Sequence, residues 1–317
     1  MKILITGGTG LVGSSFAGIE APHELVLVSS SDYDLTNESQ IIRMFETHKP
    51  NGLIHLAARV GGVWANTEYM ADFFYQNIMM NTMLLHHAAR FGVNKVVSLL
   101  STCVYPNDNI KWPLTEDQIH AGPPHQSNFG YAHAKRMLDV QSQAYRQQYG
   151  CNFVTVVPNN LYGKHDNFDK KNSHVIPAIM RKIWEAKLSG EQPAFWGDGT
   201  PQREFTYAPD LAKILLMVLE HYNDPEPLNI GYGRNISIMY LVEKISTYLE
   251  YEGPISWDVT MPSGQYKKPS STHKWSQLQL AGSMPEFNEY TDIEDGLKET
   301  CDWFKETYPQ VRGVTIK

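Results

Sequence analysis

Short apolar runs alternate with segments of helix length along the first half of the chain. The runs with the length and composition of buried strands are KILIT (2–6), ELVLVSS (24–30), NGLIHLAA (51–58), NKVVSLLS (94–101) and NFVTVVP (152–158). Residues 69–92 and 131–150, between later runs, are long enough for helices. Strands that alternate with helices pair in parallel and are covered on both faces. The pattern therefore predicts an α/β fold built on a doubly wound parallel sheet.

A glycine-rich loop, TGGTGLVG, follows the first predicted strand, and helical apolar spacing begins at Leu11 and runs to Ile19. Without side chains, backbone N–H groups can approach a pyrophosphate at the positive end of a helix. Glycines between a strand and a helix can also simply make a tight turn. The strand and helix on either side favour dinucleotide binding in a Rossmann-type domain. The predicted cofactor contacts in this loop are Gly7, Gly10, Leu11, Val12 and Gly13.

The end of the second predicted strand bears on the choice between NAD and NADP. An acidic residue there would bond the ribose 2'-OH and repel a 2'-phosphate, but the strand ends in serines at 29–31. Those hydroxyls permit a phosphate, and the residues favour NADP on this ground, although no Lys or Arg stands between Lys2 and Arg43. Asp34 lies just beyond the strand, where it is interpreted as an adenine contact, a solvated loop acid or a helix cap.

Tyr131 and Lys135 stand four residues apart in YAHAK, on one face of a predicted helix. An ammonium beside a phenol favours the phenolate and would lower the pKa of the tyrosine. Ser101, at the end of the preceding strand, can hydrogen-bond the same substrate oxygen. Tyr and Lys at this spacing are common on any helix. Their combination with the glycine loop and Ser101 predicts catalytic roles for all three.

Cys103 follows Ser101 by two residues, so in an extended strand both side chains would face the same side. A cysteine after a strand is usually a small buried hydrophobe, and His174, at the start of a predicted helix, would ordinarily be a cap or a surface residue. A sugar with a ketone at C4 offers another use for the pair. Its C3 and C5 hydrogens are acidic, and inversion needs a base on one face and an acid on the other. Cys103 would be the base and His174 the acid, because a thiol and an imidazole ordinarily titrate on either side of neutrality.

Composition narrows the functional classes. The 317 residues carry a net charge of -7, which argues against nucleic-acid binding because nothing neutralises a phosphate backbone. No apolar run approaches the ~18 residues of a spanning helix, so no membrane insertion is expected. Three sparse cysteines and an amino terminus that runs directly into a strand predict a reducing cytoplasmic compartment. No metal site is expected.

Several longer motifs are shared with one known family: TGGTGLVG, HLAARVGGVWAN, DFFYQN, LSTCVYP, GPPHQSNFGYAHAKRM, PNNLYGKHDNF, SHVIPAIMRK, WGDGTPQREF and PSGQYKK. On these motifs, which span nearly the whole chain, the sequence resembles the GDP-L-fucose synthases, a family of extended short-chain dehydrogenases. The resemblance implies conversion of GDP-4-keto-6-deoxy-D-mannose to GDP-L-fucose by C3 and C5 epimerisation and NADPH-dependent C4 reduction. The alternatives are another nucleotide-sugar epimerase or reductase, such as a colitose-type synthase or a 4-epimerase, and a non-catalytic dinucleotide-binding sensor.

The same resemblance implies roles for individual residues. Reduction would use Ser101, Tyr131 and Lys135, and epimerisation would use Cys103 and His174. The further cofactor contacts would be Asp34, Leu35, Ala57, Ala58, Lys135, Pro158, Asn160, Leu161 and His174. The GDP-sugar contacts would be Lys182, Trp196, Arg203 and Lys268. Three residues depart from the family pattern: Lys164 replaces a proline, Ser31 lacks basic character, and Asn159 replaces a threonine.

The alternation of strands and helices degrades after Pro158 into loops, with predicted helices at 174–188, 210–221 and 237–250. We expect a dinucleotide-binding Rossmann domain over 1–160 and a smaller α/β domain, mainly for the GDP-sugar, over 161–317. Segments near 204–232 are expected to return to the first domain.

The predicted helix over 69–91 carries more apolar surface than one sheet face needs, at Met70, Phe73, Phe74, Asn77, Met80, Leu84 and Ala88. Its pairing with the Tyr131 helix of each subunit predicts a homodimer through a four-helix bundle, as the resemblance also implies. A purely intramolecular core is the alternative.

Overall fold

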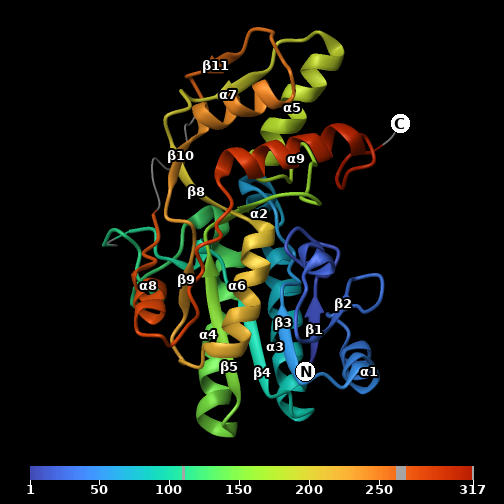
Figure 1. Cartoon of the computed structure of the whole chain (residues 1–317), viewed down its shortest axis with the longest axis vertical. Coiled ribbons are helices and arrows are strands. Elements are labelled where there is room, and N and C mark those ends of the chain that lie inside the picture. The colour runs from blue at the N-terminus through green and yellow to red at the C-terminus, as the bar shows by residue number, and fades with distance from the viewer. Residues whose placement is uncertain (109–110, 262–268, 316–317) are drawn as a thin grey trace.

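A parallel sheet forms the lower body of the computed structural model, which describes residues 1–108, 111–261 and 269–315 (Figure 1). Within those ranges this sheet has six strands in the order β2-β1-β3-β4-β5-β9. The strands are β1 (Lys2–Thr6), β2 (Glu24–Val28), β3 (Gly52–His55), β4 (Lys95–Leu99), β5 (Asn152–Pro158) and β9 (Leu228–Ile230). All neighbours pair in parallel, so the predicted sheet is confirmed and its carboxyl ends meet at one edge.

Helices cover both faces of this sheet, as the apolar runs predict. Alternate residues of β1 point to opposite faces: Ile3 and Ile5 join one core and Leu4 joins the other. The first core is completed mainly by α6 (Ala208–His221) and the second by α1 (Glu38–His48), α3 (Met70–Arg90) and α4 (Phe129–Tyr149). The sheet is therefore doubly wound.

The segment after the glycine loop differs from the prediction. It is a short 3-10 helix, η1 (Gly13–Gly18), rather than an α-helix from Leu11 to Ile19. Glycines stand at both of its ends and weaken an α-helix, and the chain must turn back to reach β2 at Glu24. Backbone N–H groups of the loop, more than the dipole of a long helix, are thus available to a phosphate.

A second body, the upper part of Figure 1, has its own core. One of its sheets has the order β10-β8-β6 and another pairs β11 with β7. Its strands are β6 (Asn160–Tyr162), β7 (Ala194–Trp196), β8 (Gln202–Tyr207), β10 (Asn235–Ser237) and β11 (Ser256–Asp258). The helices around its core are α5 (Val175–Ser189), α7 (Ile238–Tyr248) and α9 (Ile293–Thr307). The predicted helices 174–188, 210–221 and 237–250 correspond to α5, α6 and α7.

Several segments from the second half of the chain pack on the large sheet. β9 extends it beside β5, and α8 (His273–Leu280) contacts β9 and buries Trp275 in the same core as α6. The domain limits 1–160 and 161–317 stay a prediction.

The helices α3 and α4 lie side by side and touch closely, since a Cβ on Gly130 would lie 2.5 Å from the carbonyl oxygen of Met70. Much of the apolar surface that the sequence assigns to a dimer is covered within the chain: Phe73, Asn77, Leu84 and Ala88 are buried. Phe74 differs, because 43% of it stays exposed.

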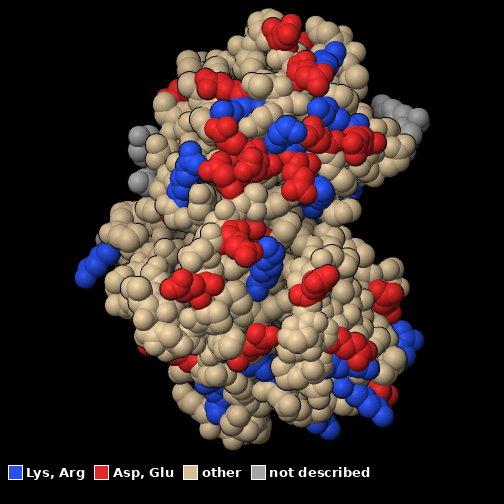
Figure 2. Space-filling model, in the orientation of Figure 1, with Lys and Arg blue, Asp and Glu red and all other residues tan. Residues whose placement is uncertain are grey.

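Charged residues on the outer surface largely neutralise one another. Figure 2 shows acidic and basic side chains intermingled over the upper body, where α9 lies. There Lys298 pairs with Asp302 at 2.9 Å and Lys164 pairs with Glu299 at 2.7 Å. None of the described helices combines the length and the apolar character that crossing a membrane requires.

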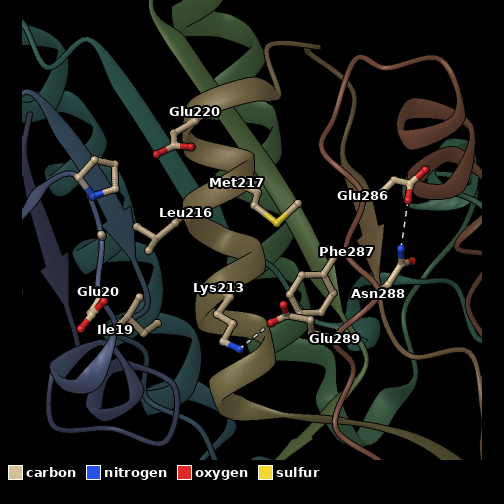
Figure 3. A pocket seen from close by; sticks show the side chains of 12 residues that line it. Ile19, Glu20, Lys213, Leu216, Met217, Glu220, Glu286, Phe287, Asn288 and Glu289 are labelled. Carbon is tan, nitrogen blue, oxygen red and sulfur yellow. Dashed lines mark hydrogen bonds and ion pairs between the residues drawn. The ribbon is translucent and has the colours of Figure 1, made fainter.

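A hollow of about 460 Å³ opens on the outer side of α6 (Figure 3). The hollow is lined by apolar residues such as Met217 and Phe287 and by acidic ones such as Glu220. Lys213 and Glu289, which also line it, form an ion pair at 3.2 Å. It contains none of the residues that the sequence selects for catalysis or binding.

Candidate active site

A cavity of about 1660 Å³ lies at the carboxyl ends of the parallel strands and continues along the second body. This is where doubly wound sheets bind their ligands. Every site residue predicted from the sequence lines it except Lys268, which lies outside the described residues. Segments up to two hundred residues apart are thereby brought to one place, although lining a cavity does not by itself assign a role.

The glycine loop turns too tightly for side chains at two positions. A Cβ on Gly13 would lie 2.1 Å from the carbonyl oxygen of Gly7, and Gly7 itself has a φ of +74° and sits against Ala57. At Gly10 a Cβ would approach only the Gly7 carbonyl oxygen, at 3.2 Å. Gly10, Leu11 and the neighbouring backbone line the cavity. This cradle fits the close approach of a pyrophosphate.

Hydrogen bonds organise the polar residues at the end of β2. The Ser29 and Ser31 hydroxyls lie 2.7 Å apart, and the Ser29 hydroxyl donates to Asp32 at 2.8 Å. Asp34 accepts hydrogen bonds from the hydroxyl and N–H of Thr36, which lower the pKa of its carboxyl. Asp34 is thus an exposed acid of the turn before α1 that also lines the cavity beside Leu35.

A cation lies closer to this end of the cavity than the sequence suggests. The guanidinium of Arg43, on α1, lies over the ring of Tyr33 at 5.3 Å from its centroid. Tyr33 lines the cavity with Ser29. The loop after β2 has no basic residue of its own, but α1 brings the guanidinium of Arg43 next to Tyr33.

Ser101 and Cys103 line the cavity together, but the predicted extended backbone is wrong. β4 ends at Leu99, and Ser101 is the N-cap of a 3-10 turn, η2 (Thr102–Val104), whose Cys103 N–H donates to the Ser101 hydroxyl at 3.3 Å. The serine side chain satisfies an amide at the start of the turn, which favours the turn over a continued strand. Both side chains still reach the cavity.

Tyr131 and Lys135 lie buried on α4 beside that turn. Burial first, and then the thiol of Cys103, raise the pKa of Tyr131, while a hydrogen bond with Ser101 lowers it. The expected lowering of this pKa is thus not found, since desolvation of the phenolate outweighs the opposing hydrogen bond. The ammonium of Lys135 instead donates to the Leu99 carbonyl at 2.7 Å, and burial lowers its pKa to about 7.

A buried polar chain behind Lys135 was not predicted. His55 at the end of β3 bonds Thr6 at 2.9 Å through one ring nitrogen and Asn81 at 3.0 Å through the other. Burial, followed by the charge of Lys135, lowers the pKa of His55 to about 3, so the ring is neutral. Asn81 donates to the carbonyl of Ala134, one residue before Lys135, at 3.3 Å. The chain ties β1, β3, α3 and α4 together beneath the site.

The two residues predicted for proton transfer both line the cavity and come from elements far apart in the sequence, η2 and the start of α5. Cys103 is half-buried and packs against a small cluster of Ala65, Phe73 and Tyr131, yet lines the cavity. His174 is exposed at the N-cap of α5, and its side chain makes no capping hydrogen bond. The imidazole is therefore not occupied as a helix cap.

The segment after β5 contributes Pro158, Asn160 and Leu161 to the cavity, while Ala57 and Ala58 enter it after β3. Asn159, which replaces the threonine of the family pattern, has an unusual environment. Its side-chain nitrogen and oxygen are both buried without a hydrogen-bond partner, and Gly231 makes room for them. A bound ligand could satisfy them.

The predicted GDP-sugar residues Lys182, Trp196 and Arg203 line the part of the cavity that belongs to the second body. Lys182 donates to the Ala194 carbonyl at 2.7 Å, with its ammonium 4.9 Å from the centroid of the Phe195 ring. Trp196 keeps 65% of its surface exposed, a large apolar face without cover. Burial lowers the pKa of both Lys182 and Arg203. Lys164, which replaces the proline of the family pattern, forms the surface ion pair with Glu299 described above.

Other residues line the cavity without having been predicted, among them Asn66, Asp166 and Arg312. Arg312 lies five residues from the end of the chain and has no motif around it, so only the fold could reveal it. Asp166 stands inside the HDNF motif and could have been considered from its position alone.

Comparisons with known proteins show the family of this chain. Residues 3–231 match the NAD dependent epimerase/dehydratase family. The chain is 40% identical to a GDP-L-fucose synthase of Dictyostelium discoideum, over 98% of this chain and 97% of that protein, and 34% identical to a GDP-L-colitose synthase of Yersinia pseudotuberculosis, over 96% and 98%. It is also similar to the crystal structure of a GDP-L-fucose synthetase from Naegleria fowleri bound to NADP. The TM-score is 0.91 and the identity 38%, with coverage of 98% of this chain and 94% of that one.

Proposed function

We propose a function on the premise that this chain belongs to the NAD dependent epimerase/dehydratase family and, within it, to the GDP-L-fucose synthases. It is an NADP-dependent enzyme that converts GDP-4-keto-6-deoxy-D-mannose to GDP-L-fucose, by epimerisation at C3 and C5 and reduction at C4. The observation that carries this proposal is one cavity lined both by the Ser101, Tyr131 and Lys135 group and by the Cys103 and His174 pair.

The residues at the strand ends suit NADP(H). Gly7, Gly10 and Gly13 would hold the pyrophosphate, with Leu11 and Val12 beside it. The adenosine end would meet Asp34, Leu35 and the serines at 29–31, and the nicotinamide would meet Ala57, Ala58, Pro158, Asn160 and Leu161, with Lys135 and His174 nearby. When bound, the reduced cofactor supplies the hydride for C4.

Epimerisation needs a base and an acid on opposite faces of the sugar. Cys103 removes the proton from C3 or C5, and the resulting enolate spreads its charge onto the oxygen at C4. His174 returns a proton from the other face. The two residues approach the cavity from η2 and from the start of α5, and this supports the assignment.

Reduction uses the same oxygen. Tyr131 donates a proton to it while Ser101 polarises the carbonyl by hydrogen bonding. A pKa of Tyr131 raised by burial suits this direction of the reaction, because the phenol stays protonated until it is needed. Lys135 then stabilises the phenolate and helps to reprotonate it.

Substrate binding would engage mainly the segment over 161–317, through Lys182, Trp196, Arg203 and Lys268, and the cofactor would occupy mainly 1–160. Arginine and lysine pair with phosphate oxygens, and the exposed indole of Trp196 can cover an apolar ligand face. A cytoplasmic location is proposed, since all three cysteines are free thiols.

A homodimer through a four-helix bundle belongs to the same proposal. Exposed apolar side chains remain on α3 and α4 at Phe74, Phe129 and Val140. The two helices run alongside each other, so a second copy of the pair could cover these residues.

One incubation tests the activity. Purified protein is mixed with GDP-4-keto-6-deoxy-D-mannose and NADPH or NADH, and the product is identified by NMR. We expect GDP-L-fucose and faster turnover with NADPH. A product with unaltered C3 or C5 configuration would favour another nucleotide-sugar reductase of the superfamily. Absence of hydride transfer to any nucleotide sugar would favour a non-catalytic sensor.

A further inference from the structure

A buried carboxylate stands in the wall of the catalytic cavity without full hydrogen bonding. Asp166 is only 5% exposed. One of its oxygens accepts the N–H of Asn167 at 2.7 Å, whereas the other, Oδ2, has no partner. Burying a carboxylate oxygen without a hydrogen-bond partner lowers the stability of the folded state, so such an oxygen is expected to have a functional reason.

The loop that begins at Asp166 ends at His174, and it is firmly held. Asp169 accepts the N–H of Asn172 at 2.9 Å, and its carbonyl accepts the N–H of Ser173 at 3.0 Å. The loop is thus folded back on itself between Asp169 and Ser173, the residue that precedes His174.

The carboxyl-terminal segment fastens this loop from outside. The N–H of Phe168 donates to the Arg312 carbonyl at 2.8 Å, and Arg181 bridges the carbonyls of Phe168 and Gly313 at 2.7 and 3.0 Å. A Cβ on Gly313 would lie 2.3 Å from the Asn167 side-chain oxygen, so the packing is close. The position of Asp166 is therefore set by the fold.

Two basic side chains act on this carboxylate. Burial raises the pKa of Asp166, and His174, then the N–H of Asn167, then Arg312 lower it. The nearby basic side chains have other partners: His165 packs against Trp303 with ring centroids 5.0 Å apart, and Lys164 pairs with Glu299. Within the loop, Lys170 pairs with Glu185 at 2.7 Å and the ammonium of Lys171 lies 5.1 Å from the centroid of the Trp64 ring. His174 and Arg312 are thus its candidate partners, and all three line the cavity.

We infer that Asp166 is a positioning residue for His174, whose imidazole N–H its free oxygen accepts during epimerisation. This inference rests on the proposed function. The Cys103 thiolate takes the proton as the C–H bond breaks, and becomes a thiol. The enolate then takes a proton from protonated His174, which becomes neutral, and solvent resets both groups. Asp166 keeps its charge throughout, orients the ring and favours its protonated form.

The test separates exchange from reduction. The full chain and its Asp166→Asn and Asp166→Glu variants are incubated in D2O with GDP-4-keto-6-deoxy-D-mannose and NADP+, which provides no hydride. Deuterium entering C3 and C5 is followed by NMR across a pH range around neutrality, and thermal unfolding reports whether each variant is folded.

We expect Asp166→Asn to lower the maximal exchange rate about tenfold to a hundredfold. KM for the GDP-sugar should change by less than about twofold. The pH–rate profile should move to lower pH, because loss of the negative charge disfavours the protonated imidazole. Asp166→Glu keeps the charge but displaces it by one methylene, so it should retain the profile with a reduced rate.

Several outcomes would overturn the inference. One is an unaltered rate and profile in folded Asp166→Asn. A raised KM with an unshifted profile would assign the carboxylate to sugar binding instead. If Asp166→Asn fails to fold, an unaltered rate in Asp166→Glu overturns the inference. Absence of deuterium uptake by the unmodified chain would refute the proposed epimerase function itself. Deuterium uptake that is the same with and without the Asp166 substitutions would refute only the role of Asp166.

Discussion

Replacing Lys135 by methionine should stabilise the protein while removing its reductase activity. Lys135 is fully enclosed on α4, and burial lowers its pKa from 10.5 to about 7. Below that pH the folded protein must hold an ammonium away from water. Methionine has a similar length and no charge, so Lys135→Met relieves this cost.

The magnitude follows from the pKa. The difference between 10.5 and about 7 corresponds to about 5 kcal/mol of unfolding free energy lost when the lysine is charged. The substitution also leaves the Leu99 carbonyl without its 2.7 Å hydrogen bond, which costs about 1 to 3 kcal/mol. The net gain at neutral pH is about 2 to 4 kcal/mol.

The sign of the pH dependence distinguishes this explanation from better packing. Because the folded-state pKa is lowered, the cost is full below about pH 7 and shrinks as the pH rises toward 10.5. Urea unfolding of the cofactor-free protein at several pH values measures it. Lys213→Met is the matched control, since Lys213 is partly exposed on α6 and its removal should change stability by less than about 1 kcal/mol.

Two results would refute the reasoning. One is that Lys135→Met unfolds at a lower urea concentration than the unmodified chain at neutral pH, and the other is that its advantage stays constant as the pH rises. Either would mean that the ammonium is not the source of the cost. Hydride transfer, followed by NADPH absorbance, should fall by about a hundredfold or more in the same variant, since the lysine assists proton supply to Tyr131.

Three other substitutions test the proposed roles. Cys103→Ser should lower deuterium uptake at C3 and C5 by about a hundredfold or more. Tyr131→Phe should keep this uptake and lose NADPH oxidation. If Cys103→Ser takes up deuterium at the unmodified rate, the cysteine only contributes to packing. Trp196→Ala should raise KM for the GDP-sugar about fivefold with little change in kcat, as steady-state kinetics would reveal, because a stacking contact is worth about 1 kcal/mol. Phe74→Glu should convert a dimer to a monomer in light scattering, and an unaltered mass would exclude α3 from the interface.

The large sheet could be predicted from sequence because its signals are local. Apolar runs of five to eight residues predict β1 to β5 with ends within three residues of those observed, and the glycine loop marks where β1 ends. Helix type was less predictable: the apolar spacing after Leu11 suggests an α-helix, but glycines at 13 and 18 leave a short 3-10 turn. The spacing of apolar residues shows which face of a helix is apolar, but it does not show how many helical turns form.

The site shows the same division. Tyr131 and Lys135 could be paired from their spacing on one helix, yet the direction in which the pKa of Tyr131 moves depends on how deeply α4 is buried. The chain from Thr6 through His55 to Asn81 joins residues from three separate elements, and Arg312 reaches the cavity from the end of the sequence. No periodicity links such residues, because only tertiary packing brings them together.

A protonated Tyr131 explains how one cavity can serve two reactions in order. Burial raises the pKa of the phenol, so the phenol stays protonated, and in the proposed mechanism Cys103 removes the C–H proton. As a donor it can hydrogen-bond the oxygen at C4 in both steps, first where the enolate charge collects and then where hydride transfer creates an alkoxide. Hydride addition at C4 and protonation of its oxygen complete the alcohol, and loss of the carbonyl ends the acidity of C3 and C5. Reduction before epimerisation would therefore trap the unconverted sugar, so hydride transfer must be the slower step on the bound ketone if both centres are to be inverted.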